Sequence, residues 1–473
     1  MNKRFWISAA VLLGTFCLLF SAFALAGGAL FLRDGGLFDR SGVGELVTTL
    51  ESEVGQPPVG TPGAALPTPP GEDPAALSSE VRSAMEGIEG QVSALRGLTI
   101  DEDVTRAVLT PAQLRDRVVN EFFEDYTPEE MQDDLQVLSA FGLLEADFDL
   151  YQLYVDLYSE QIAGYYDDET QSMYVIQDEA FRGPERMTYA HEYVHALQDQ
   201  AFGLRDGLNL YDEYCEEQTE YCGAVSALVE GDASLSEQLW LIQYASDQDR
   251  REIQDFYDDY QSPVYDAAPE FLRQDFLFPY QQGLGFVQML YEEGGWPAVD
   301  EAYRQPPVTT EQILHPERYP TDEPVEVTLP ELPAVLGEGW RELDANVLGE
   351  WYTYLVLAAG RDPGARLSDE QARSAAEGWG GDRYAVAFND QTGRRVLAMD
   401  TRWDTTGDAD QFWQAFADYG SARWGRPAES SEERLAWDAA GDGAVLAQRS
   451  GDAVRWVIAP DEATADQVLG ALP

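Results

Sequence analysis

Two histidines and a glutamate stand at a spacing that suits metal chemistry. His191 and His195 are four residues apart, and Glu192 directly follows the first of them. On a helix, residues four apart project from one face, so both imidazoles can reach one ion with the glutamate beside them. This His-Glu-x-x-His pattern is typical of zinc hydrolases, in which the glutamate addresses a water on the metal. The chain has only 3 histidines, which makes a chance match rare.

A catalytic zinc normally has three protein ligands and one open position, so the pattern requires a third ligand. We expect Glu230 in this role, because it interrupts an apolar helical segment and a buried carboxylate needs a partner. The alternative is that Glu230 pairs with an arginine or faces solvent. Its neighbours at helical spacing are all small and would let its helix lie close to the histidine helix: Ser226, Ala227, Ala233 and Ser234.

These residues together resemble the gluzincin superfamily of zinc peptidases, in which HExxH is followed by a glutamate on a later helix. The strings at residues 191–200 and 228–233 are similar to a group of membrane or secreted bacterial and archaeal gluzincin-like proteins. The resemblance implies a mostly helical zincin-like domain that binds Zn²⁺ through His191, His195 and Glu230. It also implies Glu192 as the general base.

One position departs from the gluzincin pattern. Many gluzincins carry an aspartate four residues after the ligand glutamate, where it supports a zinc histidine. This chain has Ser234 at that place. We therefore expect Asp232 or Asp199 to serve as the supporting carboxylate.

Two further residues are candidates to stabilise the oxyanion of the reaction. His315 is loosely similar to a later histidine that approaches the metal in some gluzincins. The alternative for His315 is a ring that ends a helix and is satisfied by a backbone carbonyl. Tyr166 is the second candidate, and packing in a strand is the alternative for it.

The expected function is zinc-dependent hydrolysis of peptide bonds outside the cytoplasm. The run Met173–Ile176 predicts a hairpin or edge strand that could bind an extended peptide or protein substrate by strand addition. One alternative is a non-catalytic, zinc-containing envelope binding or scaffold protein. Another is that the C-terminal part is a binding module, with residues 378–384 as a ligand turn rather than a glycine turn that enters a strand.

The charge of the chain excludes one class of partner. It carries 86 acidic and 30 basic side chains, a formal net charge of −56. Such a chain repels nucleic acid, so we expect no nucleic-acid partner. The oligomeric state cannot be inferred from these features.

The N-terminal segment predicts a location. Lys3 and Arg4 precede an uncharged run over residues 5–32, which is longer than the roughly 20 residues that a helix needs to cross a bilayer. We therefore expect a membrane anchor with the body outside the cytoplasm. A cleaved signal peptide ending near Ala24–Ala26, with the protein then secreted, is the alternative.

Cys215 and Cys222 lie close together in an acidic stretch. Cysteines at this spacing outside the cytoplasm predict a disulfide across a short loop, with two free thiols as the alternative.

The order of the segments predicts an α+β protein in four parts. These are an anchor over residues 1–32, a Pro/Gly-rich linker over 33–80, a metallopeptidase domain over 81–338 and a smaller α+β domain over 339–473. Helices over 184–200 and 223–244 are expected to carry the site. In the last part, strands are expected at 384–388, 395–399, 444–448 and 454–458, with helices between them.

Overall fold

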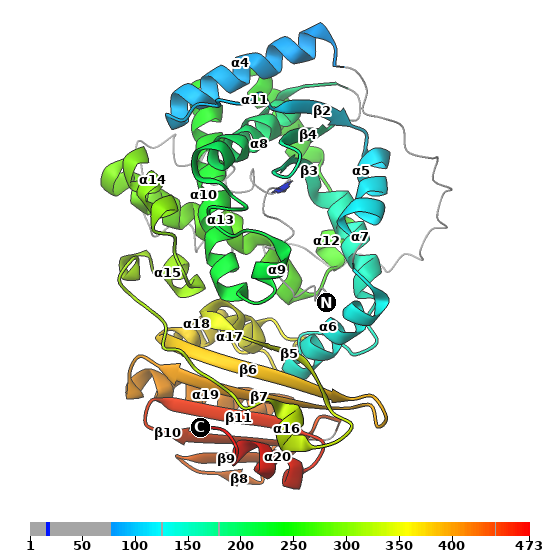
Figure 1. Ribbon diagram of the computed structural model, residues 1–473, viewed down its shortest axis with the longest axis vertical. Helices are drawn as coiled ribbons and strands as arrows, with labels where there is room; N and C mark the ends of the chain where they lie inside the picture. Colours follow the sequence, from blue (N-terminus) through cyan, green and yellow to red (C-terminus); the bar gives the residue numbers. More distant parts are fainter. Residues whose placement is uncertain (1–15, 19–76, 124–125, 178–179, 440) are drawn as a thin grey trace.

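The computed structural model describes residues 16–18 and 77–473, apart from 124–125, 178–179 and 440. It has the predicted α+β class, with a helical unit at one end and a seven-stranded sheet with its own helices at the other (Figure 1). The two ends share one continuous hydrophobic cluster, which extends from Ala107 to Ile458.

The helical elements of the first unit are α4 (Ser79–Arg96), α5 (Pro111–Arg117), the π-helical turn η2 (Val118–Phe122), α6 (Pro128–Phe141), α7 (Leu150–Gln161), α8 (Gly183–Phe202), α9 (Asp212–Cys215), α10 (Thr219–Gln243), α11 (Asp247–Asp259), α12 (Pro263–Ala267), α13 (Glu270–Gly294), α14 (Trp296–Arg304), α15 (Thr310–Leu314) and the 3-10 turn η3 (Pro316–Arg318). Its strands are β1 (Phe16–Leu18), β2 (Thr105–Leu109), β3 (Ile162–Asp167) and β4 (Ser172–Ile176).

The elements of the second unit are α16 (Leu332–Leu336), β5 (Arg341–Asn346), α17 (Gly349–Ala358), α18 (Asp369–Ala376), β6 (Trp379–Asn389), β7 (Arg394–Trp403), α19 (Thr406–Trp424), β8 (Glu429–Ser430), β9 (Arg434–Ala439), β10 (Gly443–Ser450), β11 (Ala453–Ala459) and α20 (Glu462–Leu469).

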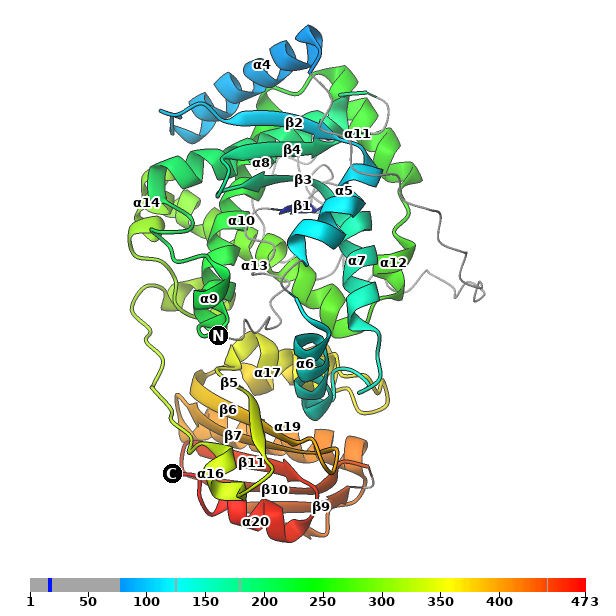
Figure 2. The ribbon, with the colours of Figure 1, turned by 45° about the vertical axis from the view of Figure 1, so that its right-hand side comes forward.

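The small sheet has the order β1-β3-β4-β2 and lies beside α8 (Figure 2). Strands β3 and β4 form the predicted hairpin, and β2 adds to the other side of β4 in parallel. The prediction that Met173–Ile176 is an edge strand is therefore wrong, because β4 has a partner on both sides. The side of β3 away from β4 pairs with the short strand β1 in antiparallel orientation.

Helices α8 and α10 form the centre of the first unit. Pro184 lies in the first turn of α8, and the Glu185 carboxylate accepts a hydrogen bond from the Arg182 backbone, which together favour the helix start. Helix α10 is buried on nearly every side as far as Glu237, and only its last turn reaches solvent, so it serves as the core helix.

Close backbone contact fixes the place where α10 crosses α13. A Cβ on Gly231 would lie 2.2 Å from the Gly283 carbonyl oxygen, and one on Gly283 would lie 2.0 Å from the Ala227 carbonyl oxygen. The small residues around Glu230 were expected to let α10 approach α8. The contact that requires glycine at position 231 is instead with α13, because the two backbones touch there.

The seven-stranded sheet has the order β5-β6-β7-β11-β10-β9-β8, with antiparallel neighbours throughout. Side chains alternate along β10: Val445 packs into the main cluster, whereas Leu446 packs under α16 and α20. All four predicted strands are present, as parts of β6, β7, β10 and β11. Trp379 is buried at the start of β6 and donates to Asp382, so the suggested ligand turn at 378–384 enters the core as a strand.

No helix in the described part of the chain is long and apolar enough to cross a membrane. Within the expected anchor over residues 5–32, Phe16–Leu18 form strand β1 and not a helix. A strand shares its backbone hydrogen bonds with a neighbouring strand, whereas a single spanning helix satisfies them internally. We therefore correct the prediction of a membrane anchor. The rest of that segment, the suggested cleavage site and the linker as far as residue 76 lie outside the described residues.

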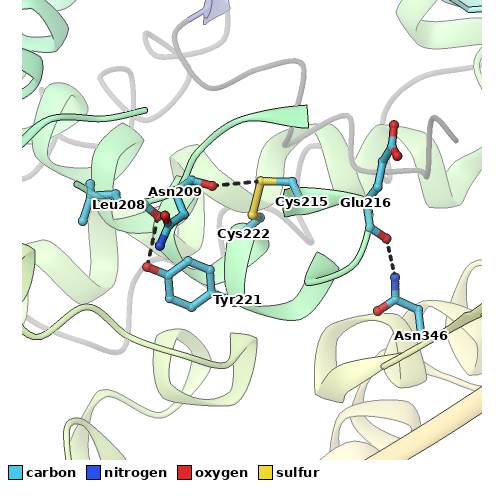
Figure 3. Close-up of a disulfide and its surroundings, with 7 residues drawn as sticks. All are labelled: Leu208, Asn209, Cys215, Glu216, Tyr221, Cys222 and Asn346. Carbon is cyan, nitrogen blue, oxygen red and sulfur yellow. Dashed lines mark hydrogen bonds between the residues drawn. A yellow bond between two sulfur atoms is a disulfide. The ribbon is translucent and has the colours of Figure 1, made fainter. Parts of the chain in front are cut away.

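The predicted disulfide between Cys215 and Cys222 is confirmed (Figure 3). It joins α9 to the first turn of α10 and therefore ties the loop after α8 to the helix that carries Glu230. Two hydrogen bonds hold the same region. The Tyr221 hydroxyl donates to the Leu208 carbonyl at 3.1 Å, and the side-chain amide of Asn346 donates to the Glu216 carbonyl at 2.8 Å.

Candidate metal centre

Helices α8 and α10 bring the four central residues of the sequence motif together. His191, Glu192 and His195 lie on α8, and Glu230 lies on α10. All four side chains are fully buried. The two histidines are one turn apart, and their ring centroids are 4.9 Å apart. The helix therefore presents both rings toward α10, as the spacing predicts.

Three potential ligand atoms converge between the helices. Nε2 of His191 lies 3.1 Å from Oε2 of Glu230, and Nε2 of His195 lies 3.6 Å from the same oxygen. One ligand atom from each residue lies within 4.8 Å of the other two. The structure thus assembles the predicted ligand set at a distance that a single ion can bridge.

The donor set of this cluster fits a zinc ion. Nε2 of His195 and Oε1 of Glu230 are buried and have no hydrogen-bond partner among the described residues. Buried polar atoms without a partner cost free energy, so a bound cation would remove a cost that the folded chain otherwise carries. Two imidazoles and one carboxylate are the ligand types of catalytic zinc sites, which leave one position open.

Each histidine also has a side-chain oxygen near its Nδ1. Nδ1 of His195 forms a hydrogen bond with Oε1 of Gln198 at 2.9 Å, whereas Nδ1 of His191 lies at an ion-pair distance of 3.2 Å from Oε2 of Glu237, without hydrogen-bond geometry. The Gln198 amide donates in turn to the Val229 carbonyl and to Asp232. The acceptor on Nδ1 of His195 keeps the proton there and leaves Nε2 open for a metal.

The supporting residues differ from those expected from the sequence. Asp232 reaches His195 only through Gln198 within the described part of the chain, and Asp199 accepts a hydrogen bond from Tyr166 instead. Sequence analysis missed Glu237 as the partner of His191. A signal existed, since Glu237 lies two helical turns after Glu230 and therefore on the same side of the apolar helix α10.

A buried charge network surrounds Asp232. Arg96 of α4 makes a two-point ion pair with it, at 2.8 and 3.1 Å, and also contacts Asp300 at 2.7 Å. The Tyr303 hydroxyl donates to Asp232 at 2.9 Å. Because a buried carboxylate is costly without partners, these contacts hold α4, α10 and α14 together behind the histidines.

The charges of Glu230 and the two histidines stabilise one another. Burial disfavours the ionised form of Glu230, but the histidines outweigh this effect and hold the pKa of Glu230 below its usual value. Burial likewise lowers the pKa of His191, but the contacts with Glu230 and Glu237 raise it to about 10.

The two predicted oxyanion donors lie elsewhere. The Tyr166 hydroxyl donates to Asp199 at 2.9 Å, and burial followed by the Asp199 charge raises the pKa of Tyr166. His315 lies where α15 meets α17, with Nε2 at 2.8 Å from Oε1 of Glu350. The His315 ring is therefore held by a side chain. Both predictions for His315 are therefore wrong: it is neither a donor at the candidate metal site nor a ring satisfied by a backbone carbonyl.

Two residues beside the cluster were not singled out from the sequence. Tyr280 of α13 is buried, and its ring centroid lies 6.3 Å from that of His191. Gly164 of β3 lies against Glu192, since a Cβ there would be 3.2 Å from Cγ of Glu192 and 2.7 Å from Cγ2 of Thr188. Strand β3 therefore passes directly over the expected general base.

Comparison with known proteins assigns a family model to one part of the chain. A model described as a domain of unknown function (DUF8575) matches residues 336–469, from the last residue of α16 to the last residue of α20. No curated protein and no solved structure matches the chain. The candidate metal centre lies entirely outside the matched segment.

Proposed function

We propose that this protein is a zinc-dependent hydrolase of peptide bonds. The observation that carries the proposal is the convergence of His191, His195 and Glu230 on one point, with Glu192 on the adjoining position of α8. These three residues would hold Zn²⁺, which supplies Lewis-acid activation of a water and of the scissile carbonyl. Glu192 accepts the proton of the attacking water on its carboxylate and delivers it to the leaving amine.

Peptide as the substrate class is supported by strand β3. Its side away from β4 holds β1 in antiparallel orientation, which shows that this side pairs with an extended backbone, and the pairing places Cys17 opposite Gly164. Gly164 is also the residue that lies against Glu192. An extended substrate would have to displace β1 to pair along this side, and its backbone would then lie next to Glu192. The net charge of −56 favours neutral or basic peptides over acidic ones.

A structural zinc site in a binding or scaffold protein is the competing function, and the complete burial of the cluster favours it. Structural zinc sites have four protein ligands. Glu237 is a further carboxylate in contact with the cluster, but it faces Nδ1 of His191 and not Nε2. Three converging ligand atoms therefore support catalysis better than structure.

The test uses the purified chain and the substitution Glu192→Gln. The amide is nearly isosteric, so fold and zinc content are expected to persist, but an amide cannot accept the water proton. Turnover of an unstructured, lysine-containing peptide is expected to fall roughly 10²–10⁴-fold. The wild-type chain should bind about one zinc and lose activity with a chelator, and Glu230→Ala should lose the zinc.

Two results would count against the proposal. Equal turnover by the wild type and Glu192→Gln would assign the activity to another site or to a contaminant. One zinc per chain without turnover of any peptide tested would favour the structural-zinc function.

A further inference from the structure

A cavity far from the metal centre gathers positive charge in a strongly acidic protein. It has a volume of about 530 Å³ and lies where the loop after α6 meets the α17–α18 loop, the end of α19 and the turn before β10. Its lining includes Arg361, Arg366, Arg395 and Arg423. The whole chain has only 30 basic side chains against 86 acidic ones, so four arginines around one cavity are a marked local concentration.

Two of these arginines have structural contacts that explain their presence. Arg423 donates to the Phe141 carbonyl at 2.9 Å, and Arg361 donates to the Leu144 carbonyl at 2.8 Å. Both therefore satisfy carbonyl groups at and after the C-terminal end of α6. Gly142 permits this approach, because a Cβ at that position would lie 2.4 Å from a guanidinium nitrogen of Arg423.

A single carboxylate is shared among three of the guanidinium groups. Oδ2 of Asp442 accepts a hydrogen bond from Arg423 at 2.9 Å. Oδ1 of the same carboxylate lies 3.7 Å from Arg395 and 4.0 Å from Arg361. The indole of Trp424 also donates to Asp442, at 2.9 Å. The carboxylate is therefore engaged mainly by Arg423, and the contacts with the other two arginines are too long for normal hydrogen bonds.

Of the three guanidinium groups around Asp442, that of Arg395 has the fewest close partners for its positive charge. It donates a hydrogen bond to the Gln136 side chain at 3.3 Å, and only 21% of its own side chain is exposed. Burial lowers the pKa of Arg395, and the charges of Arg361 and Arg423 lower it further, against the opposing effect of Asp442. The carboxylates around Arg395 therefore do not neutralise its positive charge fully.

The remaining acidic residues of the cavity lie at its rim. The Glu145 side chain is 67% exposed and lies 3.3 Å from Arg361. Asp362 is exposed and accepts a hydrogen bond from Gly364 of its own loop. Arg366 is held by the Gly360 carbonyl at 2.7 Å and lies 3.8 Å from Glu270. Exposed carboxylates compensate a buried charge poorly, because solvent screens them.

We propose that this cavity binds a small oxyanion of the phosphate class, with Arg395 as its main ligand and Arg361 beside it. Guanidinium groups present planar pairs of donors that match phosphate oxygens. A phosphate dianion would supply the negative charge that the single shared carboxylate does not provide. All four arginines lie in the segment matched by the family of unknown function, so the site gives that segment a binding role separate from the metal centre.

The test measures binding of inorganic phosphate to the full chain by isothermal titration calorimetry, with chloride at matched ionic strength as the reference. O-phosphoserine is titrated in parallel to distinguish a free anion from a phosphoryl group on a larger molecule. Arg395→Gln is expected to weaken phosphate binding at least about tenfold, as loss of a charge-assisted hydrogen bond implies. Arg395→Lys, which keeps the charge but lacks the paired donors, should be intermediate.

Arg426→Gln is the matched control, because it removes an exposed arginine that does not line the cavity. It should bind phosphate as the wild type does. Saturable binding of either probe that Arg395→Gln weakens supports the site, and the tighter probe identifies the source of the anion. No saturable binding of either probe, or equal binding by Arg395→Gln, would overturn the proposal. If Arg395→Gln does not fold, Arg395→Lys replaces it in the test: weaker phosphate binding than wild type supports the site, and equal binding overturns it.

Discussion

Glu237 and His191 form a buried pair, with Oε2 of the glutamate 3.2 Å from Nδ1 of the imidazole and neither side chain exposed. The glutamate comes from the same helix as Glu230, two turns later. Helix α10 therefore contacts both nitrogens of one imidazole, with Glu230 on Nε2 and Glu237 on Nδ1.

Glu237→Gln is expected to weaken zinc binding about 10–100-fold, the usual effect of losing a carboxylate behind a ligand histidine. The neutral amide removes the negative charge 3.2 Å from Nδ1, so Nε2 becomes a weaker donor to the metal. Competition with a chromogenic chelator measures the affinity directly. Glu217→Gln is the control, because it makes the same change at an exposed position near the start of α10. Equal affinity of Glu237→Gln and wild type would show that the pair is only structural.

Gly164→Ala is expected to reduce peptide turnover while zinc remains bound. The added methyl would lie 2.7 Å from Cγ2 of Thr188 and 3.2 Å from Cγ of Glu192, so β3 or the Glu192 side chain must shift. Overpacking of this kind costs roughly 1–3 kcal/mol. Turnover and zinc content are measured on the same preparation.

Two variants make the Gly164→Ala result specific. Thr188→Ser in the same chain removes the closest methyl and should restore part of the activity. Gly285→Ala is the matched control, since a Cβ there meets nothing within 4 Å. Full activity of Gly164→Ala would mean that β3 moves away from α8 without consequence for Glu192.

Tyr280→Phe is expected to lower kcat, whereas His315→Ala should leave it nearly unchanged. The Tyr280 ring lies beside His191, while His315 is bound to Glu350 between α15 and α17. We infer that Tyr280 takes the oxyanion-donor role that Tyr166 and His315 do not fill, and one such hydroxyl donor is worth roughly 10²–10³ in rate. His315→Ala should instead lower the unfolding free energy by roughly 1–3 kcal/mol, because it leaves the buried Glu350 without this partner. A kcat that is lowered in His315→Ala and unchanged in Tyr280→Phe would instead assign the catalytic role to His315.

Glu220→Gln tests a pH dependence at the junction of the two units. Burial raises the pKa of Glu220 to about 8, although Thr310 donates to its carboxylate through both backbone and hydroxyl. The folded-state pKa lies above the usual value of 4.5. The stability that the protonated group contributes is therefore complete below about pH 4.5 and is lost as the pH rises toward 8.

Glutamine keeps the contacts with Thr310 but does not ionise. The unfolding free energy of Glu220→Gln relative to wild type should therefore rise as the pH rises from 4.5 to 8, with a slope of at most about 1.4 kcal/mol per pH unit. Urea unfolding at a series of pH values measures this difference, and Glu217→Gln provides the exposed control. A difference that does not change with pH would mean that Glu220 is ionised in the folded protein throughout.

The amino-acid sequence by itself determined the elements that carry the site. The four-residue spacing of His191 and His195, and the apolar run around Glu230, required two buried helices, and both exist as α8 and α10. The alternating apolar runs near the C-terminus likewise determined β6, β7, β10 and β11. These features depend on local periodicity, which the sequence states directly.

Tertiary structure alone decided which residues surround those elements. Strand β4 became internal because β2, which lies much earlier in the chain, pairs with it. Glu237 rather than Asp232 reached His191, because the rotation of α10 against α8 sets which carboxylate faces which nitrogen. Arg361, Arg395 and Arg423 are distant in the sequence and meet around Asp442 only in the folded C-terminal unit. Pairing, rotation and convergence between distant segments depend on the packing of the whole chain, and no local pattern encodes them.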